Sequence, residues 1–224
     1  VTINSDNLDI NNSSLTLGSL FDTDINVNDS INLKGRSSIE SLTPKFEHNI
    51  SGPSLINIST GRFTLEPESY ISTSNQNDDL IGASQITNLS IQADLLQMNS
   101  ANIISWTSNN SQTGNLNLDV SEIALLNNSV LGLFNFSHGG TGSVNIDSNQ
   151  IFLSDKSSIV NGVGKKTLSA KLNPYVPGSA GDIEISAERI ALNAGSYIRN
   201  AQIDTSLPGN VSVTSGEISL ADGS

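Results

Sequence analysis

The residues of this chain that could catalyse a reaction or bind a metal are few and far apart. The sequence of 224 residues contains two histidines, His48 and His138, and no cysteine. A nucleophilic triad needs hydrogen-bonding contact among its three side chains, and a zinc site needs three or four convergent His, Cys or carboxylate ligands. Because no such cluster is visible, we expect no catalytic triad, no metal site and no bound cofactor.

Acidic residues support one enzymatic hypothesis, which is action on a polysaccharide. Glycoside hydrolysis requires two carboxyl groups at a defined separation. The best candidates are Asp78 and Asp79, with Glu66 and Glu68 shortly before them. Adjacent carboxylates in a loop are more often solvated turn residues, and we expect no column of Asp or Glu to recur in neighbouring repeats. A polysaccharide-binding or polysaccharide-cleaving protein is therefore the alternative hypothesis, and a non-catalytic protein is the favoured one.

The candidate ligand-binding residues are aromatic and basic side chains in three consecutive segments between repeats. The whole chain has only one Trp, three Tyr and six Phe. Aromatic faces with polar neighbours stack on sugar rings or anchor a protein partner. The competing interpretation is that the rings fold these segments onto the body of the protein. The candidate residues are Trp106, Phe134, Phe136, His138, Lys165, Lys166 and Tyr175.

The composition argues against two classes of partner and against long helices. The formal net charge is −12, and Lys165–Lys166 is the only adjacent basic pair in the sequence. The chain thus lacks the basic footprint that nucleic acids require, and no apolar run is long enough to span a bilayer. The sequence contains 37 Ser and 28 Asn, which compete for backbone hydrogen bonds and so disfavour helix interiors.

A repeated pattern runs through the whole chain. Counted from the first residue of each copy, apolar residues fall at offsets +2, +4, +9 and +11, as in the segments 142–153, 181–192 and 209–220. The copy that begins at Thr23 fits if it is one residue short, and the first copy would begin before Val1. Alternation of period two places one face of a strand inside and the other in water. The remaining copies begin at Ser54, Thr87, Gly114, Gly142, Gly181 and Gly209.

Each copy continues with a third alternating run. Offset +15 is predicted to form an inward or corner column whose hydroxyl groups bond between copies, and offset +17 is mainly apolar. Three short strands in each of about eight copies predict an all-β parallel β-helix, or β-solenoid, over residues 1–224. The +15 residues are Ser14, Ser37, Ser69, Asn102, Ser129, Ser157, Ser196 and Ser224. The +17 residues are Thr16, Ile39, Ile71, Ile104, Leu131, Ile159 and Ile198.

The same offsets predict where the insertions lie and which residues of successive copies are aligned. Extra segments lie between offset +17 and the next copy, so that all of them should project from one corner of the solenoid. Insertions of this kind often build the binding face. Because they share offset +4, Ile146, Ile185 and Val213 are predicted to occupy one inner column. The insertions are expected at 40–53, 72–86, 105–113, 132–141, 160–180 and 199–208.

The glycine-led unit 181–198 resembles the repeats of filamentous haemagglutinin-like exoproteins of two-partner secretion systems, especially the cyanobacterial ones rich in Asn, Ser and Gly. The resemblance implies a right-handed β-helix and a large protein that is secreted or attached to the bacterial surface. It also implies an adhesin, exported through a dedicated outer-membrane transporter, that binds a glycan or protein on a host or neighbouring cell.

The secretion domain of that family usually carries an Asn-Pro-Asn-Gly or Asn-Pro-Asn-Leu signature. This chain has only the sequence Asn-Pro-Tyr-Val at 173–176. We therefore interpret it as a structural or adhesive segment of the rod that follows such a domain, and as a fragment of a longer repeat protein.

Overall fold

The computed structural model describes residues 1–18, 22–43, 54–75, 87–107, 112–136, 139–163, 178–202 and 207–224. In these ranges the chain forms fifteen β-strands and no helix. Long and short strands alternate along the sequence, so that one long strand and one short strand make one coil. The prediction of an all-β parallel solenoid is confirmed.

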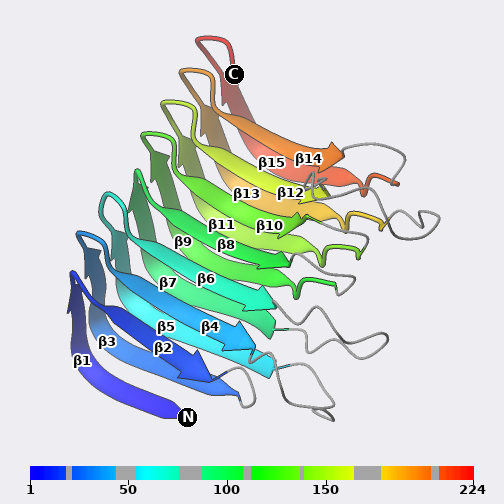
Figure 1. Cartoon of the computed structure of the whole chain (residues 1–224). Helices are drawn as coiled ribbons and strands as arrows, with labels where there is room; N and C mark the ends of the chain where they lie inside the picture. Colours follow the sequence, from blue (N-terminus) through cyan, green and yellow to red (C-terminus); the bar gives the residue numbers. More distant parts are fainter. Residues whose placement is uncertain are drawn as a thin grey trace.

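The long strands form a parallel sheet of eight, in the order β1-β3-β5-β7-β9-β11-β13-β15. The coils stack in sequence order, and the two termini lie at opposite ends of the stack (Figure 1). The strands are β1 (Thr2–Asn11), β3 (Thr23–Lys34), β5 (Ser54–Leu65), β7 (Thr87–Asn99), β9 (Leu116–Leu126), β11 (Val144–Leu153), β13 (Ile183–Leu192) and β15 (Val211–Leu220).

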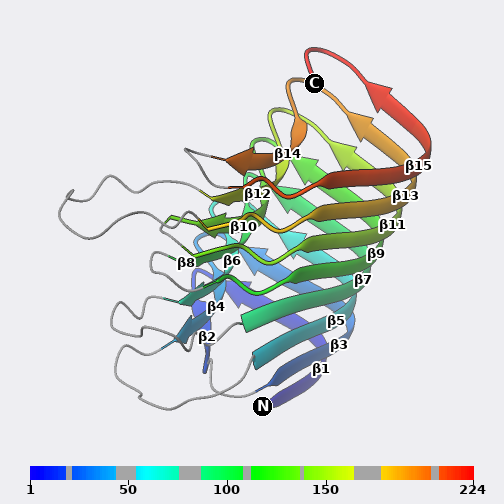
Figure 2. The same ribbon diagram turned by 90° about the vertical axis from the view of Figure 1, so that its right-hand side faces the viewer.

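The short strands form a second parallel sheet of seven, in the order β14-β12-β10-β8-β6-β4-β2. Each of them ends on the same side of the stack as the next long strand begins (Figure 2). The strands are β2 (Ser14–Gly18), β4 (Ser38–Thr43), β6 (Tyr70–Asn75), β8 (Asn102–Thr107), β10 (Val130–Asn135), β12 (Ser158–Val163) and β14 (Tyr197–Gln202).

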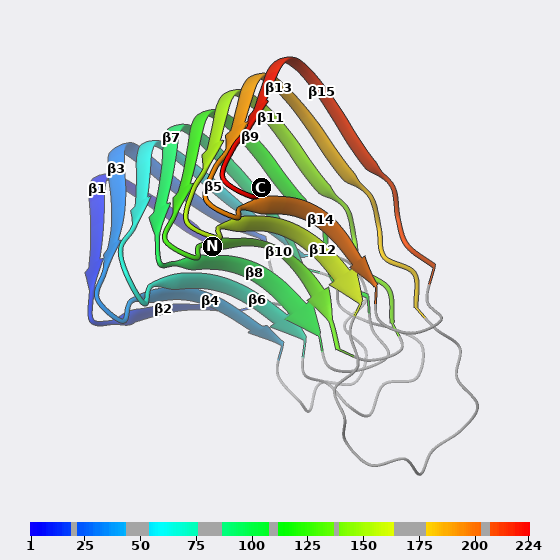
Figure 3. The same cartoon turned by 90° about the horizontal axis from the view of Figure 1, so that it is seen from above.

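Each long strand contains the first two of the three predicted runs. The expectation of separate strands was wrong because parallel pairing continues on both sides of the break, as at Ala187↔Ser215 and Arg189↔Glu217. The long strands bend instead of ending, and the coil is three-sided when viewed from above (Figure 3). The polar residues between the runs therefore form a bend within one strand.

The inner columns have the predicted register over most of the stack. Ile146 pairs with Ile185, and Ile185 pairs with Val213. The two isoleucines are each 3% exposed, whereas Val213 is 36% exposed because β15 is the last strand of its sheet. Stacked apolar columns of this kind bury side chains that one coil alone would leave in water.

The buried serine column is confirmed at five of its eight predicted positions. Ser37, Ser69, Ser129, Ser157 and Ser196 are all fully buried. The Ser37 hydroxyl donates to the Ile10 carbonyl of the preceding coil at 2.9 Å, and the Ser129 N–H donates to the Ser157 hydroxyl of the following coil at 3.2 Å. The hydroxyl groups of Ser37, Ser69, Ser129 and Ser157 thus bond to backbone groups of a neighbouring coil.

Two coils depart from the predicted frame by one residue in the corner before the short strand. Ala101 and Ile103 occupy the places predicted for Asn102 and Ile104, since Ile103 pairs with Ile71 and Leu131. Both residues are fully buried. The cause is a shorter turn, which Ser100 makes with a φ of 47°.

The first coil shows the same shift. Ser14 pairs with Ser38 and Leu15 pairs with Ile39, so that Ser13 and Leu15 replace the predicted Ser14 and Thr16 in the inner columns. Here the shorter corner is turned by Asn12, whose φ is 48°.

The second coil begins earlier than predicted. Thr23 pairs with Ile56 and Ile25 pairs with Ile58, which places Thr23 at offset +2 and Ile25 at offset +4. This copy is not one residue short, because an extra residue is accommodated at the bend between Val27 and Ser30. Thr23 is consequently buried, at 1% exposure, in a column that is otherwise apolar.

The short strands end and the next long strands begin at one corner, so the insertions leave from that corner as predicted, but they begin later (Figure 2). The short strands end at residues 43, 75, 107, 135, 163 and 202. The predicted insertions began inside these strands because the frame stopped at offset +17, although inward and outward positions continue to alternate beyond it.

Candidate functional site

Two of the candidate ligand-binding residues lie on the outer face of the short sheet. Trp106 in β8 and Phe134 in β10 are paired across neighbouring strands. They face outward because the side chains beside Trp106, those of Ser105 and Thr107, are buried. Phe136 follows β10, and its N–H donates to the Thr107 carbonyl at 2.9 Å. The assignment of Trp106 and Phe134 to insertions was therefore wrong, although their proximity was predicted.

The three rings form one contact group, which we call the aromatic cluster: Trp106, Phe134 and Phe136. The Phe134 and Phe136 rings are stacked, with centroids 6.0 Å apart and an interplanar angle of 4°. The Trp106 ring lies 6.4 Å from that of Phe136 at 57°. Such offset and tilted arrangements are the favourable ones for aromatic pairs.

A hydrogen bond and partial exposure define how the cluster can be used. The Trp106 indole N–H donates to the Ser72 hydroxyl at 3.2 Å, which fixes the ring against β6. Phe136 is 39% exposed, while Trp106 and Phe134 are half-buried. The cluster thus exposes aromatic surface whose rings are ordered by these contacts. Hydroxyl groups of the neighbouring strand lie beside it.

The remaining candidates cannot be placed with the cluster. His138, Lys165, Lys166 and Tyr175 lie outside the described residues. The same holds for His48 and for the predicted acidic pair Asp78–Asp79. Of the two glutamates proposed to accompany that pair, Glu68 forms an exposed ion pair with Arg36, with 2.7 Å between Nε and Oε2.

Two tyrosines lie on the outer face of the same sheet, at the beginning of β6 and of β14. The Tyr70 hydroxyl donates to Glu40 Oε1 at 2.5 Å. This hydrogen bond, together with burial, raises the pKa of Tyr70 above its ordinary value of 10.0. Tyr197 is 40% exposed, and the Arg199 guanidinium lies 5.5 Å from its ring centroid. Neither tyrosine contacts a ring of the aromatic cluster among the described interactions.

A polar groove of about 510 Å³ lies on the outer face of the long sheet and crosses the strands from β7 to β15. Its floor contains an amide contact between strands, in which Asn145 Nδ2 donates to Asn117 Oδ1 at 2.8 Å. The residues of the groove that carry charge or hydrogen-bonding groups include Asn117, Asp119, Asn145, Asp147, Glu184 and Ser212.

The groove contains an acidic pair that the sequence reasoning missed. Asp119 in β9 and Asp147 in β11 are paired in register, which corrects the expectation that no acidic column recurs in neighbouring coils. Both residues stand at offset +5 of the copies that begin at Gly114 and Gly142. Counting the outward offsets as carefully as the inward ones would have found them.

The described ranges contain no group of three or more His, Cys, Asp or Glu side chains that could hold a metal ion. In the same ranges, no helix has the length and apolar character needed to cross a bilayer. Comparisons with protein families, with curated proteins and with solved structures find no match to this chain.

Proposed function

We propose that this chain is a non-catalytic, adhesive segment of a large secreted or surface-attached exoprotein of the filamentous haemagglutinin-like type. The observation that carries the proposal is the aromatic cluster, which is held in an ordered arrangement on the outer face of a stacked sheet. The repeat supports it, because a solenoid displays such a surface at a distance from its point of attachment.

The cluster suits a carbohydrate ring or an apolar protein side chain. The contact between Phe134 and Phe136 and the hydrogen bond from Trp106 to Ser72 restrict the rings before any partner arrives. Rings that are already ordered lose little conformational freedom on binding, and this favours affinity. Hydroxyl groups beside the rings can then pair with the polar edge of a sugar.

The charge of the chain narrows the class of partner. A net charge of −12 repels polyanions such as nucleic acids and strongly sulfated glycans. The proposed partner is therefore a neutral or weakly charged glycan, or a protein, on the surface of a host or neighbouring cell. Export through a dedicated outer-membrane transporter and a location at the bacterial surface belong to the same proposal.

Substitution of Phe136 tests the adhesive function against a matched exposed ring. Phe136→Ala should weaken attachment to cells or to an immobilised glycan array at least tenfold. Tyr197→Ala is the control, because Tyr197 is equally exposed, at 40% against 39%, on the same sheet but outside the cluster. Thermal unfolding of both variants should stay close to that of the unchanged protein.

Two outcomes would contradict the adhesive proposal. One is equal loss of attachment by the two variants, which would show that the cluster has no special part in binding. The other is a large loss of stability in Phe136→Ala with attachment retained, which would make the rings packing residues.

A second candidate function is polysaccharide binding or cleavage in the polar groove, and the pairing of Asp119 with Asp147 favours it. Neighbouring strands lie about 4.8 Å apart, close to the ~5–5.5 Å between the carboxyl groups of retaining glycosidases. Release of reducing ends from a panel of polysaccharides, abolished in Asp147→Asn, would support cleavage. Absence of both binding and product over the whole panel would reject this candidate.

A further inference from the structure

The polar groove on the outer face of the long sheet has the size and direction of a site for an extended chain. Its volume of about 510 Å³ lies within the ~300–1,000 Å³ that is typical of ligand pockets. Its lining comes from five successive long strands, β7 to β15. Neighbouring strands lie about 4.8 Å apart, which is comparable with the length of one sugar unit in an extended glycan. Successive units of a linear polymer in the groove would therefore meet successive coils.

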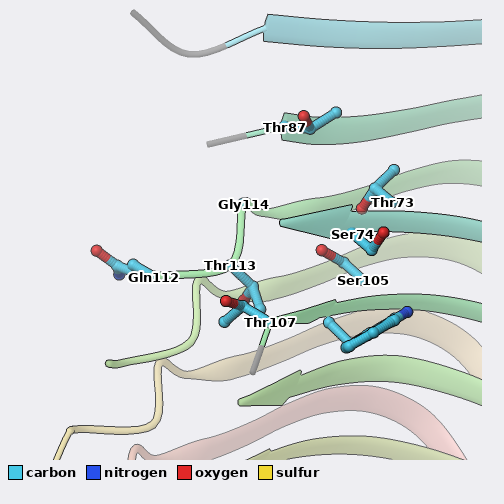
Figure 4. A pocket seen from close by; sticks show the side chains of 9 residues that line it. Thr73, Ser74, Thr87, Ser105, Thr107, Gln112, Thr113 and Gly114 are labelled. Carbon is cyan, nitrogen blue, oxygen red and sulfur yellow. The ribbon is translucent and has the colours of Figure 1, made fainter. Parts of the chain in front are cut away.

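A second hollow, in the corner between the end of β6 and the start of β9, is too small for such a ligand. Its volume is about 10 Å³. Hydroxyl-bearing side chains approach it from the short strands and from the segment that leads into β9 (Figure 4). The described residues that line it include no acidic or basic side chain. The groove is therefore the better place for a polymer.

Two carboxylates face each other in the groove without a basic neighbour. Asp119 and Asp147 are paired in register, and both are exposed. Like charges directly opposite each other on neighbouring strands repel and destabilise the sheet. Glu184, on the following strand, adds a third carboxylate, and none of the described residues that line the groove is basic. The groove thus concentrates negative charge.

Acidic side chains elsewhere in the long sheet have a favourable neighbour in the adjacent coil. Asp9 Oδ1 accepts a hydrogen bond from Asn32 Nδ2 at 2.8 Å, and Glu217 Oε2 lies 3.8 Å from Arg189 Nε. Among the register pairs of the described long strands, the pair in the groove is the one that sets two carboxylates opposite each other. A cationic group bound between them would relieve the repulsion, so the pair indicates a ligand with positive charge.

The rest of the lining is suited to sugar hydroxyls and not to a peptide. The amides of Asn117 and Asn145 offer both donors and acceptors. The apolar residues of the lining, Leu118, Ile146 and Ile185, are each only 3% exposed. The described lining therefore lacks the apolar pocket that anchors a peptide side chain.

We propose that the groove binds a linear glycan whose sugars carry free amino groups, lying along the stack with one ammonium group between Asp119 and Asp147. The inference rests on polysaccharide binding in the groove, the second candidate function, and names the class of polysaccharide. Hydrogen bonds between ammonium and carboxylate groups are roughly twice as strong as neutral ones. Asn117 and Asn145, two residues earlier on the same strands, then pair with the sugar hydroxyls.

Calorimetric titration with a linear glucosamine hexamer and with its fully N-acetylated form tests the class of ligand, because the two differ in charge and share one backbone. At about pH 5.5 the amino groups are protonated while the Asp carboxyls stay ionised. The amino form should bind at least about tenfold more tightly. Asp119→Asn should weaken binding of the amino form at least about tenfold, and that of the acetylated form less than about twofold.

Glu122→Gln is the matched control, because Glu122 is exposed on the same strand as Asp119 but outside the groove. It should leave both affinities unchanged. Asp119→Asn should be at least as stable to heat as the unchanged protein, since it removes a repulsion. If it fails to fold, Asp147→Asn takes its place. Equal loss of binding in the groove variant and in Glu122→Gln would show attraction to the overall negative charge, and would overturn the proposal.

The remaining outcomes separate this proposal from the function on which it rests. Equal affinity for the two hexamers, reduced for both by Asn145→Ala, would overturn the amino-sugar class and leave polysaccharide binding in the groove intact. Absence of binding by both hexamers would also overturn the proposal. The second candidate function fails only if the whole panel of polysaccharides shows neither binding nor product.

Discussion

At the scale of single residues, the glycines that begin the last three coils lie against the backbone of the preceding coil. A Cβ added to Gly181 would lie 2.3 Å from the Gly142 carbonyl oxygen, and one added to Gly209 would lie 2.1 Å from that of Gly181. Asn161 Nδ2 donates to the Gly142 and Gly181 carbonyls at 2.8 and 2.9 Å. The glycine that leads each copy therefore allows a close backbone contact, which an inward amide then satisfies.

Gly181→Ala should destabilise the protein because the added methyl collides with backbone that cannot move without separating two coils. Overpacking of this kind costs about 1–3 kcal/mol, which corresponds to a fall of at least about 2 °C in the melting temperature. Gly18→Ala is the control, since no atom of the described residues lies within 4 Å of a Cβ added at Gly18. Thermal unfolding followed by circular dichroism compares the two, and equal melting temperatures would contradict the close contact.

Because of the Tyr70–Glu40 hydrogen bond, the free energy of unfolding should decrease at alkaline pH. The pKa of Tyr70 is raised in the folded protein, so the contribution is fully present below the unfolded pKa of about 10. It is lost as the pH rises through the higher folded value. In a Tyr175→Phe/Tyr197→Phe background, phenolate absorbance should titrate at lower pH after Glu40→Gln. An unchanged titration midpoint would show that the hydrogen bond does not stabilise the neutral phenol.

At the scale of elements, the inner columns explain why strands form at all in so polar a chain. Ile185 is 3% exposed and is paired on both sides, with Ile146 and Val213. Outward neighbours on the same strand, such as Glu184, face solvent. One strand thus buries a continuous apolar row and leaves its other row polar, which is the pattern that allowed its prediction.

Ile185→Asp should cost more than about 3 kcal/mol, because it places an unpaired charge in the column. The expected result is a large fall in the midpoint of chemical denaturation. Glu184→Ala, on the opposite face of the same strand, should change the midpoint little. If the two variants unfold at similar denaturant concentrations, Ile185 does not face the interior.

The elements were predictable where spacing repeats and unpredictable where the corners vary. The repeated offsets gave the solenoid and the column of Ile146, Ile185 and Val213. The shorter corners gave no signal, because Asn12 and Ser100 adopt left-handed backbone conformations without being glycine, the residue usually found there.

The sequence identified two residues of the aromatic cluster but did not place them in the correct structural elements. Trp106 and Phe134 were recognised as unusual rings in a chain poor in aromatics, but the predicted strands ended before them. Most of the inward residues that continue the alternation in these strands are polar, such as Ser105 and Asn135, although Leu133 is apolar. An apolar pattern therefore could not reveal that the strands extend so far.

At the scale of the whole molecule, the two ends of the stack are chemically matched. The last coil leaves its inner columns uncovered, with Val211, Ile218 and Leu220 respectively 46%, 53% and 60% exposed. The first coil offers Ile3 and Leu8, which are only partly buried, and both ends carry an unpaired parallel strand edge. Contact between unlike ends repeats without closing, so it generates filaments and not a defined dimer.

As an isolated segment of 224 residues, this chain should therefore associate end to end in a concentration-dependent manner, by placing β1 of one copy against β15 of the next. Ile218→Lys/Leu220→Lys should suppress the association, because two charges would have to be buried at the junction. Phe152→Lys is the control, since Phe152 is an exposed apolar residue, at 37%, on the side of the stack. Light scattering and sedimentation should show growth of the unchanged protein and of Phe152→Lys, and none of the double variant. A strictly monomeric unchanged protein at high concentration would contradict the junction, and growth of the double variant would place the contact elsewhere.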